Sequence, residues 1–520
     1  MTALIFTALM VTRYPDHQAL SFCSGRTLNV PRLSRYLPNL AALLLLLNMV
    51  GCSAVGLGGG GGGGNRILTP PPAPRATPGA TSDSGTPVSV APTRLRGGGL
   101  SSTDLYVGYR ALLDRYVDQI DPGLLIGAAT DSLRNALRDQ AALPMMTMPV
   151  QLVPAPTGNA DKDWQAFGDA YDAVVAKMPD WAQQAHPDWL VMRAMTASLN
   201  DGHTLFFTPD EAKRVQETSF VGIGVVLSKP RPDQLPMIAE IFPNSPAAGS
   251  GLKRGDRIMG VDGNDVSTKT VGDIAALIRG PRGTDVKVQV KRLSSPQPLE
   301  FGMRRAQVQV EQVIVGQAPN APIGYLKIRG FTDDSVAQMV LGMLDQGPRR
   351  GLRAWVLDLR GNAGGALRSV LGVAAGLVDP AHTVIGYQVD RQRAHTPLET
   401  QSANLTSGMT LIVLVDHETA SGAEILAAAL QEAKLATLVG TKTAGNVGVA
   451  TQLQLPDESQ LQVTEQRFES PGGNQLDGVG VTPDVIVDMT DEDLENDRDP
   501  QLSRALALAV QKLVGAAAGG

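Results

Sequence analysis

The sequence predicts a multidomain α+β and α/β fold with an N-terminal helical region, a small strand-rich unit and a mixed-sheet α/β core. Three patterns support this prediction. From Thr103 onward, apolar residues recur three and four apart, as on one face of a helix. Between residues 220 and 293, two strand patterns flank a short helical one. From Ile323, short apolar runs alternate with helical segments, which is typical of a sheet covered by helices.

Composition indicates an ordinary globular protein and excludes several functions. The 520 residues are 43% hydrophobic and 18% charged, with a net charge of −6. A nucleic-acid surface needs clustered Lys and Arg, so this acidic balance argues against one. The two cysteines, Cys23 and Cys52, cannot form a disulfide framework or a four-ligand zinc site. We expect no metal and no cofactor.

The first 51 residues read as an export signal. Arg32 and Arg35 precede an apolar run, Leu40–Val50, that is too short to span a bilayer as a helix. The run ends in "MVGC", which resembles the lipobox of bacterial lipoproteins, with Cys52 as the lipidated residue. The alternative is a plain secretory signal. Both interpretations place the protein outside the cytoplasm, in the periplasm or on the cell surface.

Residues 52–100 read as a flexible linker, because a glycine run is followed by Pro, Thr and Ser. Residues 101–216 then form the N-terminal helical region, with apolar periodicity in "LYVGYRALLDRYVDQI" and "WLVMRAMTASL". This region contains the turn signal "NDGHT", Asn200–Thr204, which carries a histidine.

Residues 217–295 resemble a PDZ domain of the bacterial protease type. The resemblance rests on "GIGV", on "SPAAGSGLKRGDRIMGVDG" and on the helix "VGDIAALIRG" that follows. It implies that backbone N–H groups bind a terminal carboxylate and that a groove takes an added strand. The peptide-binding candidates are Gly222, Ile223, Gly224 and Val225 in the loop and Ile274, Leu277 and Ile278 in the helix. For each helix residue, core packing is the alternative.

A connector, 296–320, is expected to lead into the α/β core at 321–490, and a C-terminal helix closes the chain at 491–520. The core contains the strand patterns "IGYLKI", "AWVLDL", "TLIVLV" and "ATLVG". The acidic stretch "DMTDEDLENDRD" before the last helix is interpreted as a solvated connection.

Ser421 follows a buried strand pattern and has two interpretations. With Glu424 it forms a capping box ahead of an apolar helix. A serine at this place is also suited to nucleophilic attack, because helix N–H groups stabilise an anion formed there. A second source of N–H donors is the glycine-rich turn "DLRGNAGG", Asp358–Gly365, which follows another strand.

The order of "VLDLRGNAGG", "TASGAEILAAALQ", "VGTKTAG" and "GVGVTPDV" resembles the C-terminal processing peptidase and tricorn-like serine protease superfamily. The resemblance covers most of the chain after Ser102. It implies a crotonase-like core and peptide-bond hydrolysis with Ser421 as the nucleophile. It also implies oxyanion donors at Gly364 or Gly365 and at Gly422.

The general base of the processing peptidases is missing. Their second lysine aligns with Asn446 in "GTKTAGNVGVA", and Ala450 stands where they have a glutamine. Because an amide is not basic, either the enzyme is inactive or another residue takes the proton. Histidine is the natural substitute, since its pKa lies near neutral pH.

His203 is the first candidate for the base, because the tricorn-like branch carries its catalytic histidine ahead of the PDZ insertion. His417, close to Ser421 in sequence, is the second. A histidine base works best with an acidic partner. Asp477 matches the position of a tricorn-like glutamate, and Asp201 is the alternative.

These inferences lead to two hypotheses. The first is a lipid-anchored, extracytoplasmic serine endopeptidase whose PDZ domain recognises the C-termini of exported proteins. The second is an inactive pseudoprotease that acts as a peptide-binding scaffold, which the loss of the lysine motivates. Protein or peptide substrates and a membrane are the expected partners in the first case, without nucleic acid.

Overall fold

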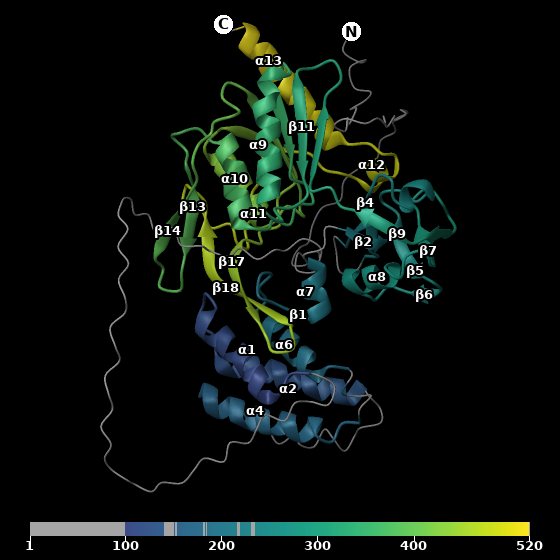
Figure 1. Cartoon of the computed structure of the whole chain (residues 1–520), viewed down its shortest axis with the longest axis vertical. Helices are drawn as coiled ribbons and strands as arrows, with labels where there is room; N and C mark the ends of the chain where they lie inside the picture. The colour runs from purple at the N-terminus through teal and green to yellow at the C-terminus, as the bar shows by residue number, and fades with distance from the viewer. Residues whose placement is uncertain are drawn as a thin grey trace, which may run out of the picture.

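The computed structural model describes residues 99–139, 150, 153–179, 183, 185–215, 219–229 and 234–518. The predicted signal segment, Cys52 and nearly all of the linker lie outside the described residues. Figure 1 shows the three predicted parts, with the N-terminal helices below, the PDZ unit to one side and the α/β core above. The predicted fold class, a mixed α/β multidomain protein, is confirmed. Among the described residues, no helix is both long and apolar enough to cross a bilayer.

The N-terminal region is a helical layer built on aromatic side chains. Its first helix begins with a capping box between Ser101 and Asp104. Tyr109 and Trp164 stack with ring centroids 4.7 Å apart, inside a core that also contains Leu461 and Val463 of strand β18. The helices are α1 (Ser102–Arg115), α2 (Pro122–Asp139), α4 (Ala160–Val175), α6 (Pro187–Ser198) and α7 (Pro209–Val215).

The predicted linker ends too late in the sequence. Leu100, its last residue, is buried, and its amide donates to Asp188 Oδ2 (2.9 Å). Its carbonyl oxygen accepts from the Tyr171 hydroxyl (3.1 Å). Burial of one leucine side chain and two paired backbone groups is enough to hold this residue against the helices.

The α/β core contains a six-stranded sheet in the order β10-β11-β12-β15-β16-β19. Strand β10 is antiparallel to β11, and the remaining pairs are parallel. All five residues of β12 are buried, as expected for a strand covered on both faces. The strands are β10 (Val313–Gln317), β11 (Ile323–Ile328), β12 (Ala354–Asp358), β15 (Thr410–Val415), β16 (Ala436–Gly440) and β19 (Val485–Ile486).

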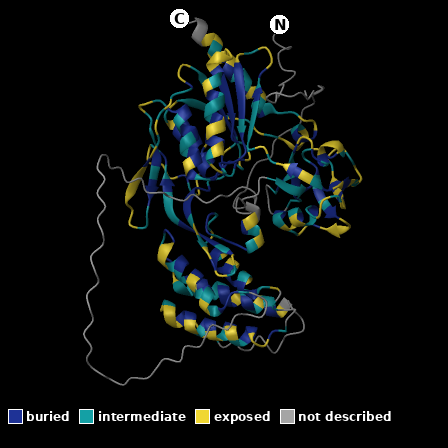
Figure 2. Cartoon of the chain, in the orientation of Figure 1, coloured by how far each residue is buried: buried dark blue, intermediate teal, exposed yellow. Residues whose placement is uncertain are grey.

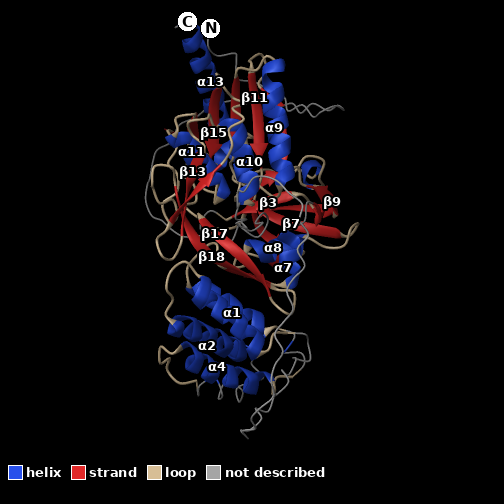
Figure 3. Ribbon diagram, turned by 60° about the vertical axis from the view of Figure 1, so that its left-hand side comes forward, coloured by secondary structure: helices blue, strands red, loops and turns tan. Residues whose placement is uncertain are grey.

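Helices cover both faces of this sheet. Val413 and its neighbours on one face pack against α9 (Asp334–Arg349), α10 (Leu367–Leu377) and α11 (Gly422–Glu432). Leu414, one residue on, faces the opposite way and packs with Ala505 of α13 (Pro500–Ala518). Figures 2 and 3 show the buried strands between these helices.

A second, antiparallel sheet joins the core to the N-terminal region. Its order is β1-β18-β13-β14, with β17 also paired to β18. Strand β1 begins two residues after His203, and Leu205 pairs with Gln462 of β18. The long ribbon of β17 and β18 reaches from the core toward α1 (Figures 1 and 3). The strands are β1 (Leu205–Phe207), β13 (Val384–Val389), β14 (His395–Glu399), β17 (Gly448–Gln454) and β18 (Gln460–Glu469).

The PDZ unit is longer than its predicted limits of 217–295. The predicted connector, 296–320, contains β8, which pairs with β7, and β9, which pairs with β2. It also contains β10 of the core sheet, so these residues are structured. The elements are β2 (Ser219–Gly222), β3 (Val225–Ser228), β4 (Met237–Ile241), β5 (Arg257–Val261), β6 (Asn264–Asp265), α8 (Val271–Ile278), β7 (Asp285–Lys291), β8 (Leu299–Arg304) and β9 (Ala306–Gln309).

The prediction of a solvated acidic connection is wrong. Part of this stretch forms helix α12 (Asp491–Glu495), which contacts the PDZ unit. Asp491 pairs with Arg257 Nη2 (2.8 Å), and the buried Glu495 accepts from the Ser294 amide (3.1 Å). A cation and a backbone N–H group of the PDZ unit therefore bind the carboxylates of Asp491 and Glu495, which the sequence pattern alone assigns to solvent.

Candidate active site

Ser421 is the N-cap of α11 and has a strained backbone. Its φ of 52° and ψ of −123° lie outside the usual regions for a residue with a side chain. Ser101 and Thr270, which also cap helices with capping boxes, have φ of −74° and −72°. Ordinary capping therefore does not require the strain at Ser421. Strain of this kind at a strand-to-helix turn is typical of a nucleophilic serine, and Ser421 is buried in this structure.

The backbone of Ser421 is bound on two sides. Its amide donates to the carbonyl oxygen of Asn446 (2.8 Å) and to Glu424 Oε2 (3.1 Å). Only the Glu424 half of the predicted capping box is therefore present, because the Glu424 amide donates to the main-chain carbonyl oxygen of Ser421 (2.9 Å) and the hydroxyl makes no cap bond. These bonds place the residue at the lysine position directly against the serine, and they hold the serine in its strained conformation.

The glycine-rich turn lies against Ser421. A Cβ atom added to Gly364 would lie 2.6 Å from Ser421 Cβ and 2.8 Å from the Gly422 nitrogen. Gly364 also has φ of +98°, which favours glycine. Its amide donates to Asn362 Oδ1 (2.8 Å), so this N–H group is not free to bind an oxyanion. Gly364 instead allows the glycine-rich turn to lie close to Ser421. Gly422 begins α11, where N–H groups have no intrahelical partner, and Gly365 nitrogen lies beside it.

Asn362 is a site residue that our sequence interpretation missed. It is fully buried, and its Nδ2 donates to the carbonyl oxygen of Ile328 (2.9 Å). Its own carbonyl oxygen accepts from the Ala420 amide (2.9 Å), one residue before the serine. One side chain thus ties the glycine turn to the sheet. An asparagine inside a glycine-rich turn was the available signal.

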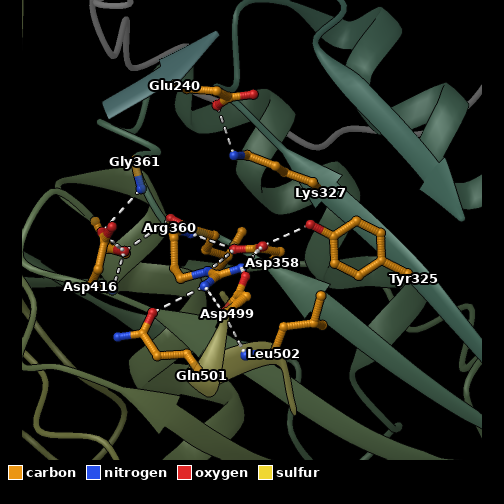
Figure 4. A network of polar contacts seen from close by, with 12 residues as sticks. Glu240, Tyr325, Lys327, Asp358, Arg360, Gly361, Asp416, Asp499, Gln501 and Leu502 are labelled. Atoms are coloured by element: carbon orange, nitrogen blue, oxygen red, sulfur yellow. Dashed lines mark hydrogen bonds and ion pairs between the residues drawn. The ribbon is translucent and has the colours of Figure 1, made fainter. Parts of the chain in front are cut away.

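A buried ion-pair network anchors the same turn (Figure 4). Arg360 pairs with Asp358 at the end of β12 (2.6 Å) and with Asp499 just before α13 (2.9 Å). The Tyr325 hydroxyl donates to Asp358 (2.8 Å), and the next amide, that of Gly361, donates to Asp416 (3.0 Å). The network fixes where the glycine turn leaves the sheet.

His203 is buried at the edge of this site, and its turn is firmly held. Its amide donates to Asp201 Oδ1 (2.9 Å), and its carbonyl oxygen accepts from Gln462 (2.9 Å). The other carboxylate oxygen of Asp201 accepts from Thr204 (2.7 Å). Asp201 thus orders the backbone of the turn. The imidazole packs over Gly448, whose added Cβ would lie 3.3 Å from ring atoms Cγ and Nδ1.

The burial of the His203 ring favours its neutral form. Burial lowers its pKa, while Asp201, Asp477 and the side chain of Asn446 oppose this shift. Among the residues that the structure describes, neither ring nitrogen has a hydrogen-bond partner. A neutral imidazole with an unoccupied nitrogen has the protonation state that a general base needs at neutral pH.

Asp477, the predicted acidic partner, is bound elsewhere. Its Oδ2 pairs with Arg467 (2.7 Å), and its Oδ1 accepts from the Val447 amide (3.3 Å). Arg467 also pairs with Asp118. Asp477 acts on the His203 ring through its charge, while its oxygens are used by other groups.

His417, the second candidate base, lies in an exposed position. About half of its side chain is accessible (53%), and its Nε2 lies 3.9 Å from Glu418 Oε1. The burial that would fix the ring toward Ser421 is missing at this residue, and the same Glu418 oxygen also accepts from the Ser228 hydroxyl. Among the described residues, no group of three His, Cys, Asp or Glu side chains is placed to hold a metal ion.

Glu424 is a second residue whose importance the sequence understated. Its carboxylate is fully buried and accepts hydrogen bonds from Thr443 Oγ1, from the amide of Gly445 (2.8 Å) and from the amide of Asn446 (3.0 Å). With the Ser421 amide it therefore joins both segments of the site. Burial raises the pKa of Glu424 to about 7, against the effect of these bonds.

We expect Glu424 to make stability fall as pH rises from about 4.5 to 7. In this window the folded state holds a proton that the unfolded state has lost, so ionisation costs about 3 kcal/mol of unfolding free energy. Glu424→Gln should remove this part of the slope. Urea unfolding at pH 5 and pH 8 measures it. Equal slopes in the wild type and the variant would contradict the assignment.

The predicted peptide-binding residues divide into two groups. Ile223, Ile274 and Ile278 are buried in the PDZ core, so core packing explains them. Leu277 is half-buried beside that core. Gly224 has φ of +81°, and its carbonyl oxygen accepts from the Phe242 amide (2.9 Å). Gly222 pairs with Ala306, and Val225 begins β3 at the edge of the sheet.

The PDZ unit is fastened to the core near the site. Glu240 of β4 pairs with Lys327 of β11 (3.0 Å; Figure 4). It also pairs with Arg329, one residue after β11, and these two cations lower the pKa of its half-buried carboxyl group. The Ser228 hydroxyl, at the end of β3, donates to Glu418, three residues before Ser421. The edge strand β3 therefore ends beside the turn that leads to Ser421.

This architecture, with a strained serine between a helix N-terminus and a glycine turn, defines a serine-peptidase-like site. Residues 322–487 match the model of peptidase family S41, and residues 237–292 match a PDZ domain model. A carboxyl-terminal-processing protease of Synechocystis sp. is 30% identical over 307 residues, covering 58% of this chain and 71% of that protein. The chain belongs to peptidase family S41, with the carboxyl-terminal-processing proteases.

Further comparisons agree. A carboxy-terminal-processing protease of Bartonella bacilliformis is 27% identical over 336 residues, covering 64% of this chain and 76% of that protein. The solved structure of a photosystem II D1 C-terminal processing protease has a TM-score of 0.51 at 23% identity, covering 74% of this chain and 93% of that chain. This likeness shows the fold. By family, the protein is a serine-type peptidase with a PDZ domain.

Proposed function

We propose that the protein is an active extracytoplasmic endopeptidase that hydrolyses peptide bonds in exported proteins, with Ser421 as nucleophile and His203 as general base. One observation carries this proposal. The strained Ser421 is bound through its amide to Asn446, and the side chain of the same asparagine lies against the turn that carries the buried His203. Neither the strained backbone of Ser421 nor the buried His203 would contribute to the function of an inactive peptide-binding scaffold.

In the proposed reaction, His203 removes the hydroxyl proton as Ser421 Oγ attacks the substrate carbonyl carbon. The amide of Gly422, with that of Gly365 after local adjustment, stabilises the resulting oxyanion. The imidazolium then gives its proton to the leaving amine as the C–N bond breaks. Water hydrolyses the acyl-enzyme by the same steps, which restores the serine.

The PDZ domain is proposed to present substrate C-termini to this site. An extended peptide would add to the free edge of β3, with its carboxylate at Gly222–Val225. The Ser228–Glu418 contact supports this direction, because it brings the far end of β3 to the Ser421 turn. Leu277 is the helix residue that remains available to contact such a peptide, since Ile274 and Ile278 are core residues.

Location outside the cytoplasm and a lipid anchor at Cys52 are part of the proposal. They rest on the apolar run Leu40–Val50 and on "MVGC". The glycine- and proline-rich segment that follows would act as a tether between the membrane and the folded part.

The second candidate function is a catalytically inactive, peptide-binding scaffold. It is favoured by Asn446 at the lysine position and by Asp477, whose oxygens are used by Arg467 and Val447. Both observations weaken a Ser–Lys mechanism and a direct Ser–His–Asp triad.

Fluorophosphonate labelling separates the two functions. We expect the folded protein to gain one phosphonyl group, which peptide mapping places on Ser421, while heat-unfolded protein stays unlabelled. C-terminal peptides that bind the PDZ domain should be cleaved. Peptide binding by an unlabelled, folded protein would establish the scaffold instead, and gain of labelling only in Asn446→Lys would do the same.

A further inference from the structure

We propose that Asn446, at the position of the absent lysine, is a positioning residue that orients His203 by accepting a hydrogen bond from its ring. This inference rests on the proposed Ser–His function. It assigns the third place in the catalytic group to an amide rather than to Asp477.

The main chain of Asn446 is fixed on two sides. Its carbonyl oxygen accepts from the Ser421 amide (2.8 Å), and its own amide donates to Glu424 Oε2 (3.0 Å). The side chain thus starts from a point set by the nucleophile itself. Any group that it holds is held relative to Ser421.

The side chain of Asn446 is directed at the turn that carries His203. It is buried, and a Cβ added to Gly202 would lie 2.5 Å from both Asn446 Oδ1 and Nδ2. Only glycine at 202 leaves room for the amide. The absence of a side chain at 202 thus allows the asparagine to lie next to the histidine.

The polar atoms between the two residues are buried and incompletely bonded. Among the described residues, both ring nitrogens of His203 and Asn446 Nδ2 have no hydrogen-bond partner. Asn446 nevertheless raises the pKa of His203, which is the effect of an acceptor that favours the imidazolium. Catalytic hydrogen bonds are often loose without substrate and tighten when it binds.

The other charged groups near the ring do not fill this role. Asp201 uses both carboxylate oxygens on the backbone of its turn and on Thr204. Asp477 is paired with Arg467, and the buried Glu424 binds backbone amides of the Asn446 segment. An uncharged acceptor is left as the partner, which fixes the tautomer and raises the pKa of His203 less than a carboxylate in its place would.

Asn446→Ala tests the proposal. We expect kcat to fall about tenfold to a hundredfold with KM within about twofold, because a misplaced base slows the chemical step. Asn446→Asp should retain more activity at high pH than Asn446→Ala does. The acid limb of its pH–rate profile should move upward from that of the wild type by about one pH unit or more, since a carboxylate stabilises the imidazolium. Asn320→Asp, on an exposed turn, adds the same charge and should leave the profile unchanged.

Gly202→Ala provides an independent test. The new methyl group should displace the Asn446 amide and reproduce the loss in kcat. In the double variant with Asn446→Ala the two losses should not add, because the collision is gone. Additive losses would show that Gly202 acts through something else and would overturn the proposed link.

A titration of His203 by NMR reads the same contact without activity. Its pKa should rise in Asn446→Asp and fall slightly in Asn446→Ala. If Ser421 is labelled and His203→Ala is inactive, but both Asn446 variants keep the wild-type profile and pKa, the positioning role is wrong while the Ser–His function stands. If the wild type itself is unlabelled, the proposed function fails first.

Discussion

Ser421→Ala is expected to lower kcat for peptide hydrolysis by about 10⁴-fold or more and to abolish fluorophosphonate labelling. The hydroxyl oxygen forms the bond to the substrate carbonyl carbon, and no neighbouring group can replace it. Peptide binding should persist, because the β3 edge and the Gly222–Val225 loop are distant in sequence and part of another domain. Steady-state kinetics and peptide binding by calorimetry measure both.

The same variant also tests the strain at Ser421. Alanine is as strained as serine at φ of 52°, so the free energy of unfolding should change little in Ser421→Ala. Ser421→Gly should raise the melting temperature, because glycine adopts this conformation without strain. Full hydrolysis by folded Ser421→Ala would refute the assignment of the nucleophile.

His203→Ala is expected to lower kcat by about 10³- to 10⁵-fold, because the serine loses its base. Burial lowers the pKa of His203. The acid limb of kcat/KM should therefore lie below pH 6.5, since activity is lost only where the ring becomes protonated. Kinetics between pH 4.5 and 9 give both results.

His417→Ala is the matched control. Its ring is exposed beside Glu418, so activity should stay within about twofold of the wild type. If His417→Ala were inactive and His203→Ala active, the two candidate bases would exchange roles. If neither mattered, a histidine base would be excluded.

Local patterns allowed much of the fold to be predicted. Apolar spacing located the N-terminal helices and the strands of the core, because burial on one or both faces imposes period on a sequence. The limits between parts were less accurate. In strand β8, Glu300 and Gly302 interrupt the apolar residues, so the sequence pattern is weak. Only the pairing of β8 with β7 identifies it as part of the PDZ sheet.

Candidate site residues within short motifs could be proposed from sequence, whereas residues that contribute to the site through packing could not. Ser421 and Gly364 could be proposed because each lies in a short motif directly after a strand pattern. Asn362 becomes important because its side chain donates to the carbonyl oxygen of Ile328, and Glu424 because amides of another segment donate to its carboxylate. These contacts depend on segments about twenty or more residues apart, which single-sequence patterns do not relate.

The sequence by itself determined the family, the nucleophile candidate and the loss of the lysine, since these depend on residue types at fixed local spacing. Only the tertiary structure decided that Asp477 pairs with Arg467, that Ile274 is a core residue and that Asn446 lies against the turn of His203. The physical reason is burial. A carboxylate, an isoleucine or an amide takes its role from the groups that exclude water around it, and the fold alone brings those groups together.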